Sequence, residues 1–225
     1  MKFGVVVFPG SNCDRDMIEA LQEDMKQEVI PLWHKDKDIS LFTKDDCIVL
    51  PGGFSYGDYL RCGAIARFSP MMQAVIEFAN EGGKVLGVCN GFQILCESGL
   101  LPGALLRNGN MQFVCKNVYI INENDPKKEV IKVPVAHGEG RYYADQHTLD
   151  KLDANRQIIF RYCDKDGNIN DQSNPNGSTN NIAGICNEAR NVAGMMPHPE
   201  RACSLLLGNE DGKKVLAQLF SINER

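Results

Sequence analysis

The chain has 225 residues, of which 43% are hydrophobic and 24% charged, and its formal net charge is -5 at pH 7. This length and composition are typical of a soluble globular domain with a sizeable core, and we expect residues 1–225 to form one domain. The acidic balance argues against a surface that binds nucleic acid, and the longest apolar runs are too short to span a membrane.

The first half of the chain alternates between apolar strands and helical segments. Strands are predicted over Phe3–Phe8, Val29–Trp33 and Cys47–Leu50, and helices over Asp14–Met25 and Pro70–Asn80. Continuous apolar runs of this kind are typical of strands that are buried on both faces of a parallel sheet. The alternation predicts a doubly wound α/β fold, with a flavodoxin-like, open, mostly parallel sheet and helices on both faces.

A glycine loop, Pro51-Gly52-Gly53, directly follows the third of these strands. In open α/β sheets the functional site lies beyond the carboxyl ends of the strands, where this loop is placed. The loop is therefore expected to turn backbone N–H groups towards a developing oxyanion, with Gly53 as one donor. A plain tight turn is the alternative. Neither a G-x-G-x-x-G nor a Walker A pattern is present, so no nucleotide cofactor is expected in this chain.

The next apolar run, Val85–Val88, leads into Gly87-Val88-Cys89-Asn90-Gly91 and then into a helical spacing of apolar residues. A nucleophile with glycines two residues away on each side, between strand and helix, is the pattern of a nucleophile elbow. The helix N-terminus favours the thiolate form of Cys89, and the N–H of Asn90 is predicted as the second oxyanion donor. A buried structural cysteine is the alternative.

After residue 100 the pattern becomes rich in strands. Strands are predicted over Phe113–Ile121, Val130–Val135, Ile158–Cys163, Asn181–Cys186 and Val192–Met196, and a closing helix over Lys213–Phe220. Loops rich in Asn, Gly and Pro separate these segments. No internal repeat or linker divides the chain.

The segment Met196–Arg201 supplies what a thiol nucleophile needs, which is a base and an acceptor that orients the base. Pro197 and Pro199 argue against a helix, so we expect an extended backbone on which His198 and Glu200 point to the same face. The sequence therefore predicts a catalytic triad of Cys89, His198 and Glu200.

The nine cysteines are an odd number, and none falls in a C-x-x-C pair. Neither a disulfide framework nor a zinc site is predicted, and no metal is expected. The chain starts directly with a strand and shows no basic-then-apolar leader, so we expect a cytoplasmic protein in a reducing environment.

The glycine loop, the elbow and the His-x-Glu segment, in this order, resemble the class I (triad-type) glutamine amidotransferases. The finer resemblance is to the glutaminase subunits of phosphoribosylformylglycinamidine synthases, which act in purine biosynthesis. Four stretches carry it beyond the generic motifs: Phe8–Asp14, Gly52–Ala64, Val135–Arg141 and Met195–Arg201. The resemblance covers most of the chain and implies a single glutamine amidotransferase type 1 domain.

The resemblance implies that Cys89 attacks the side-chain amide of glutamine, with His198 as general base and Glu200 orienting it. A glutamyl thioester forms, ammonia leaves, and water then releases glutamate. The residues that the resemblance places at the glutamine pocket, by main chain or side chain, are Gly52, Gln93, His137, Gly138 and Glu139. An exposed helical position is the alternative for Gln93, and a second catalytic base is a less favoured alternative for His137.

The resemblance also implies partners. Ammonia would pass to a separate synthetase subunit, which binds ATP, Mg²⁺ and formylglycinamide ribonucleotide, and a small third subunit would complete the assembly. The segment Tyr56–Arg67 is the candidate for docking or ammonia gating, and the isolated chain is expected to be a poor glutaminase. The alternatives are a stress protein or peptidase of the same sheet fold with a cysteine elbow, or a catalytically silent binding subunit.

Overall fold

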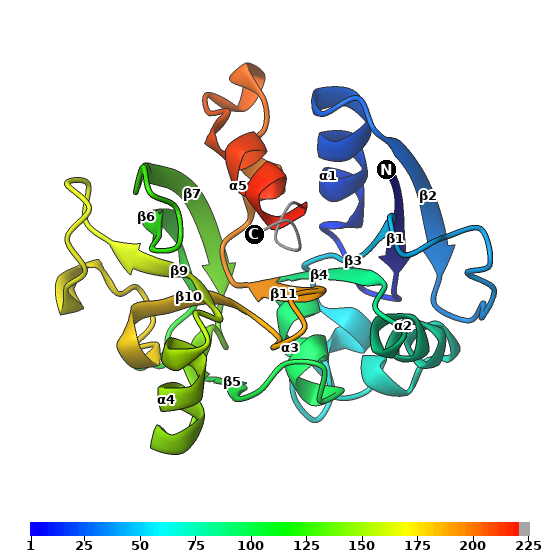
Figure 1. The fold of residues 1–225 in the computed structure, drawn as a ribbon, viewed down its shortest axis with the longest axis horizontal. Coiled ribbons are helices and arrows are strands. Elements are labelled where there is room, and N and C mark those ends of the chain that lie inside the picture. Colours follow the sequence, from blue (N-terminus) through cyan, green and yellow to red (C-terminus); the bar gives the residue numbers. More distant parts are fainter. Residues whose placement is uncertain (221–225) are drawn as a thin grey trace.

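This computed structural model describes residues 1–220 of the chain. They form a mixed β-sheet with helices packed against it (Figure 1). Its parallel half consists of β1 (Lys2–Val7), β2 (Glu28–Trp33), β3 (Cys47–Leu50), β4 (Lys84–Val88) and β11 (Val192–Met195). The apolar runs of β1, β3, β4 and β11 are almost entirely buried, as the sequence predicts for strands covered on both faces.

The sheet continues beyond β11 as an antiparallel half. Its strands are β6 (Val114–Asn122), β7 (Val130–His137), β9 (Ile158–Cys163) and β10 (Ile182–Cys186). Within residues 1–220 the order across the sheet is β2-β1-β3-β4-β11-β10-β9-β6-β7. The predicted parallel sheet is thus confirmed in the half that carries the elbow, and every strand predicted in the second half of the chain is found within two residues of its expected ends.

Helices cover both faces of the parallel half, as predicted. They are α1 (Asp14–Glu19), α2 (Pro70–Asn80), α3 (Asn90–Glu97) and α5 (Asp211–Phe220). In Figure 1, α1 and α5 lie on one side of the sheet, and α2 and α3 lie on the other. A π-helix over Ala20–Asp24 extends α1 to nearly the length that the sequence predicts. Among the helices of residues 1–220, none is long and apolar enough to cross a membrane.

Three short elements of the structure were not predicted. They are α4 (Gln146–Ala154) and a small antiparallel pair formed by β5 (Ala104–Leu106) and β8 (Arg141–Tyr143). The helix has a low apolar content and buries only Leu149 and Leu152 among its residues, so its helical period is hard to detect. Its start does carry a signal, because the Asp145 side chain accepts a hydrogen bond from the N–H of Thr148 at 2.7 Å.

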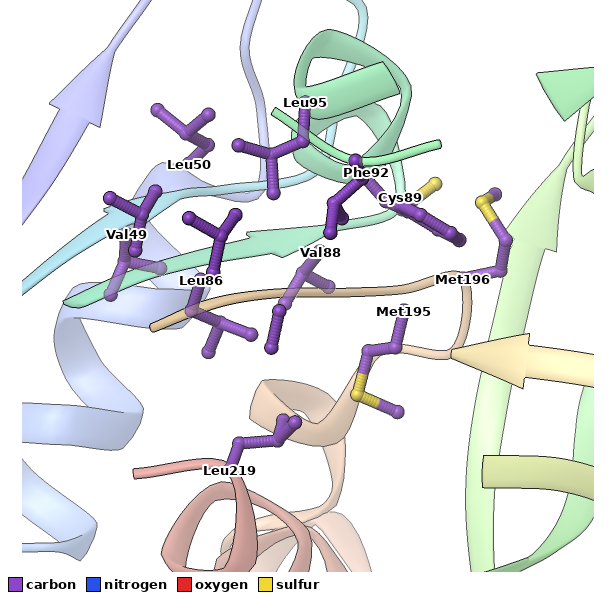
Figure 2. Packing of buried hydrophobic residues seen from close by; sticks show 14 of the residues in the cluster. Val49, Leu50, Leu86, Val88, Cys89, Phe92, Leu95, Met195, Met196 and Leu219 are labelled. Carbon is purple, nitrogen blue, oxygen red and sulfur yellow. The ribbon is translucent and has the colours of Figure 1, made fainter. Parts of the chain in front are cut away.

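The core is continuous around β4. Figure 2 shows Leu86 and Val88 of this strand between Leu95 on α3 and Leu219 on α5. Each fully buried side chain of this size contributes roughly 1.5–3 kcal/mol to stability. The strand that leads into residue 89 is therefore held on both faces, which gives the following turn a rigid base.

Candidate active site

Cys89 lies in the turn between β4 and α3, with φ 51° and ψ -104°. This backbone conformation is rare for a residue with a side chain and is the strained turn that an elbow requires. A β-carbon at Gly91 would overlap the carbonyl oxygen of Leu50 in β3, so the helix can approach the sheet only with glycine at that position. The predicted strand, sharp turn and helix around Cys89 are confirmed.

The sheet topology brings the thiol and the histidine to the same place. β4 and β11 are parallel neighbours in which Val88 pairs with Met195. Cys89 directly follows Val88, and His198 follows Met195 by three residues, so both leave the sheet at its carboxyl edge. Cys89 and His198 line the same cavity, although the two residues are far apart in sequence.

His198 and Glu200 form a buried pair. Nδ1 of the imidazole lies 2.6 Å from Oε1 of Glu200, and both side chains are almost completely buried. The predicted extended backbone is wrong at Glu200, because a 3-10 helix covers Pro199–Ala202. A proline is tolerated at the first position of a helix, where its missing N–H costs no hydrogen bond. The predicted contact between His198 and Glu200 thus forms with Glu200 in a 3-10 helix instead of an extended segment.

The surroundings of His198 set its charge. Burial by itself lowers the pKa of the imidazole, but attraction to Glu200 and Cys89 outweighs burial and raises the pKa well above its ordinary value. Nε2 of His198 is buried and has no hydrogen-bond partner among residues 1–220. The ring therefore combines an oriented Nδ1 with an Nε2 that can exchange a proton with a bound molecule.

The antiparallel half of the sheet curves back over this pair. The N–H of His198 donates to the carbonyl of Pro134 in β7 at 2.8 Å. In a flat sheet the backbones of β7 and β11, four positions apart in the strand order, would be separated by roughly 19 Å. The three residues from Met195 to His198 can span only about 10 Å, so the contact requires strong curvature. This curvature encloses the site with residues of β7 and the loop after it.

The enclosed cavity has a volume of about 130 Å³. This is far below the roughly 300–1,000 Å³ of a site for a drug-sized ligand, and it suits a molecule such as an amino acid. The residues that line the cavity are Asn12, Cys13, Gly53, Phe54, Asp58, Cys62, Cys89, Gln93, Phe113, Ala136, His137, Gly138, Glu139, His198 and Arg201.

The glycine loop lies where the sequence places it. Gly53 lines the cavity with φ 125°, a value that favours glycine. Gly52 lies behind it against the imidazole, since a β-carbon there would be 2.6 Å from Cε1 of His198. Asn90 is the first residue of α3, so its N–H has no partner within the helix. The oxyanion roles of Gly53 and Asn90 remain predictions.

Gln93 is buried, which excludes the alternative of an exposed helical residue. Its side-chain oxygen accepts from Nδ2 of Asn90 at 2.9 Å, and its Nε2 donates to the carbonyl of Glu139 at 2.7 Å. The amide therefore ties α3 to the loop that contains Gly138 and Glu139. Gln93 faces the cavity as predicted, and its contact with a substrate remains a prediction.

His137 is buried between two asparagine side chains. Its Nδ1 lies 3.1 Å from Oδ1 of Asn108, and its Nε2 lies 3.3 Å from Nδ2 of Asn176. Burial, with repulsion from His198 as a smaller cause, lowers the pKa of His137 to about 4. Since both ring nitrogens are engaged by the chain itself, the structure favours a wall of the cavity over a second base.

Several cavity residues have no counterpart in the sequence prediction of the site: Asn12, Cys13, Asp58, Cys62 and Arg201. All five lie in the stretches that carry the finer family resemblance, which was the signal that could have identified them.

The thiol of Cys13 lies 3.1 Å from Nη2 of Arg201. Within residues 1–220, the group that could hold a metal ion is Cys13, His198 and Glu200, whose ligand atoms lie within 4.8 Å of one another. A metal there would compete with the His198–Glu200 hydrogen bond.

The chain is similar to known proteins over almost its whole length. Residues 1–219 match the family described as CobB/CobQ-like glutamine amidotransferase domain. A relative from Moorella thermoacetica, named phosphoribosylformylglycinamidine synthase subunit PurQ, is 56% identical, with 100% of this chain and 98% of the relative covered. A protein of the same name from Acaryochloris marina is 58% identical, with 94% and 92% covered.

Solved structures agree with this similarity. A chain in the structure of PurLQS from Thermotoga maritima is 42% identical, with a TM-score of 0.82 and 97% of this chain and 96% of that chain covered. A glutamine amidotransferase from Thermotoga maritima is 15% identical, with a TM-score of 0.57 and 100% and 89% covered, and it supports the fold alone. These similarities do not favour a stress protein or a peptidase. The chain belongs to the family of CobB/CobQ-like glutamine amidotransferase domains.

Proposed function

We propose that this chain is the glutaminase subunit of a phosphoribosylformylglycinamidine synthase, which releases ammonia from glutamine for a step of purine biosynthesis. The observation that carries the proposal is one cavity of amino-acid size that is lined by Cys89, in its strained turn, and by His198, which is hydrogen-bonded to the buried Glu200. The similarity to subunits of that name over almost the whole chain supports the same assignment.

In the proposed reaction, the thiolate of Cys89 attacks the side-chain amide carbon of glutamine, and the oxyanion is held by the N–H groups of Gly53 and Asn90. The carbon–nitrogen bond then breaks, and the proton carried by His198 passes to the departing nitrogen, so that ammonia leaves and a thioester remains. His198 next takes a proton from water, whose oxygen attacks the thioester to give glutamate and the free thiol. Glu200 holds the imidazole in one orientation throughout.

The ammonia is proposed to pass to a synthetase subunit, where ATP, Mg²⁺ and formylglycinamide ribonucleotide bind, while this chain carries no cofactor. A small third subunit completes the proposed assembly, which would work in the cytoplasm. The PurLQS structure supports assembly with partners of this kind. The docking segment is proposed to be Tyr56–Arg67, where Tyr59 and Leu60 are exposed beside the cavity residue Asp58.

Activity in the isolated chain is proposed to be low, because the glycine loop is held next to a segment with unusual backbone angles. Tyr56, Asp58 and Leu60 all have positive φ without being glycine. A partner that binds this segment can shift the adjacent Gly53 into its productive position.

The test is to measure glutamate release by the wild type and Cys89→Ala, each alone and with the synthetase subunit, the third subunit, ATP, Mg²⁺ and formylglycinamide ribonucleotide. We expect activity mainly in the assembled wild type, and its loss in Cys89→Ala. Full activity in Cys89→Ala would disprove the nucleophile, and equal wild-type turnover with and without partners would disprove the coupling.

A further inference from the structure

Two carboxylates face the same cavity beside the nucleophile. Asp58 and Glu139 both line it, and the thiol of Cys62 donates to Oδ2 of Asp58 at 3.1 Å. Burial, with both carboxylates as further causes, raises the pKa of Cys62 well above its ordinary value, so it remains a neutral thiol. The thiol therefore donates a hydrogen bond and leaves the negative charge of the pair uncompensated.

The chain supplies no cation to Asp58. Within residues 1–220, no ion pair includes this residue. Arg61, from the same segment, pairs instead with Glu97 at 2.6 Å, and Arg201, which lines the cavity, pairs with Asp16 at 2.8 Å. The arginines near the cavity are thus engaged elsewhere, and a partly buried carboxylate without a counter-ion favours a positively charged ligand group.

Glu139 is almost as weakly compensated. Its nearest ion-pair partner is Arg107, at 3.9 Å and with a largely exposed side chain, where solvent screens the interaction. Burial, with repulsion from Glu139 as a smaller cause, outweighs the hydrogen bonds from Cys62 and Asn90 and raises the pKa of Asp58. Two like charges at one small cavity are costly unless something bound between them is positive.

Asp58 is fixed relative to the nucleophile. Its Oδ1 accepts from Nδ2 of Asn90 at 3.1 Å, and Asn90 directly follows Cys89. Its backbone has φ 51°, a strained value for a residue that is not glycine. The same Asn90 Nδ2 also reaches Gln93 at 2.9 Å, so the carboxylate, the elbow helix and the cavity wall form one hydrogen-bonded unit.

We propose that Asp58, together with Glu139, binds the α-ammonium group of the substrate amino acid and selects free glutamine over analogues that lack this group. The inference rests on the proposed glutaminase function and deepens it. In glutamine the α-ammonium is several bonds from the amide carbon that Cys89 attacks. The carboxylate of Asp58 is hydrogen-bonded to Asn90, the residue after the nucleophile, and lines the same cavity. It is therefore placed to bind the α-ammonium group through charge-assisted hydrogen bonds.

The structure offers one competing role for Asp58, which is to position Asn90. That role needs only a hydrogen-bond acceptor, and asparagine at position 58 would still provide one. Removing the charge therefore separates the two roles, provided that the substrate's own charge is removed in a matched measurement. Glutaramate, which has hydrogen in place of the α-amino group of glutamine, serves this purpose.

The experiment measures kcat and KM for glutamine and for glutaramate in the assembled complex, with wild type, Asp58→Asn and the exposed control Asp150→Asn. We expect wild type to prefer glutamine by roughly 100-fold or more in kcat/KM. Asp58→Asn should lower kcat/KM for glutamine roughly 10- to 100-fold, mainly through KM, and leave glutaramate within about threefold. Asp150→Asn should match wild type on both substrates.

Other outcomes overturn the inference in distinct ways. Equal losses on both substrates in Asp58→Asn would mean that the residue only positions Asn90, and no loss on either would exclude any role. Equal use of glutamine and glutaramate by wild type would contradict the inference even if Asp58→Asn failed to fold. If the wild-type complex released no glutamate from glutamine, the proposed function itself would fail.

Discussion

Two buried histidines of the site have opposite tendencies to bind a proton, and the groups around each ring explain the difference. His198 contacts a carboxylate, which raises its pKa, whereas burial, with repulsion from His198 as a smaller cause, lowers the pKa of His137 to about 4, and the two neutral amides beside His137 do not offset this. His137 is therefore neutral at physiological pH. Its Nδ1–H donates to Asn108, and its Nε2 accepts from Asn176, an arrangement that a second ring proton would break.

The low pKa of His137 makes stability depend on pH. Between its unfolded pKa of about 6.5 and its folded pKa of about 4, the unfolded chain binds a proton that the folded chain does not, so stability falls as pH falls. The loss reaches about 3 kcal/mol at the lower end. We expect His137→Gln to lose less stability over this window, measured by urea unfolding at each pH.

The exposed His147→Gln serves as the control for a His-to-Gln change outside the cavity. Because repulsion between His137 and His198 is one cause of the low pKa of His137, the difference between wild type and His137→Gln includes this coupling between the two rings. Parallel curves for wild type and His137→Gln would show that His137 does not set the acid limb.

At the scale of elements, the elbow depends on how closely α3 approaches β3. Gly91 leaves room for the carbonyl of Leu50, and Phe92 occupies the space that a side chain at Gly194 of β11 would need. The helix that positions Cys89 thus packs closely against β3 and β11, the two strands on either side of β4, and each contact depends on a glycine. Its orientation, and with it the strained turn, is set by packing rather than by the helix alone.

We expect Gly91→Ala to destabilise the protein by about 2 kcal/mol or more, because the added methyl group must push α3 away from β3. Glutaminase activity should fall with it, since the displacement moves Cys89. Urea unfolding and glutamate release in the complex measure the two effects. Gly109→Ala is the control, with no steric overlap at its β-carbon, and should stay within roughly 0.5 kcal/mol of wild type. Equal stability of the two variants would refute the packing argument.

The elements that the sequence predicts well are those with strong local patterns. Buried strands, the elbow and the His-x-Glu pair follow from short stretches, and α2 matches its predicted bounds from Pro70 to Asn80. Helix α4 is too polar, and strands β5 and β8 are too short, to give a recognisable hydrophobic pattern in the sequence. Asp58 could not be placed, because its position depends on positive φ at a residue that is not glycine and on a contact with Asn90, which lies far away in sequence.

At the scale of the whole molecule, apolar side chains are exposed around the cavity. Phe54 and Phe113 line it while remaining about half exposed, and Tyr59 and Leu60 extend beside it. An apolar surface next to a catalytic cavity is typical of a protein that binds a partner there. This position supports the proposed docking of a synthetase subunit beside the cavity.

We expect Leu60→Asp to weaken binding to the synthetase subunit roughly tenfold or more, because interface cores exclude charged groups. Leu206→Asp is the matched control, since Leu206 is 98% exposed and Leu60 is 91% exposed, but Leu206 lies in a different turn. Isothermal titration calorimetry measures both. If Leu206→Asp weakens binding and Leu60→Asp does not, the docking surface lies over the Leu205–Leu207 turn instead.

The position of β11 determines when this molecule can acquire its activity during synthesis. Among residues 1–220 it is the last strand to leave the ribosome, yet it inserts between β4 and β10 at the centre of the sheet. A nascent chain that ends before β11 has two half-sheets with a gap between them, and pairing across such a sequence separation is slow. Cys89 and His198 can therefore line one cavity only after β11 and the segment that follows it have been synthesised and β11 has inserted between the two half-sheets, so the sheet and the cavity are completed in the same step.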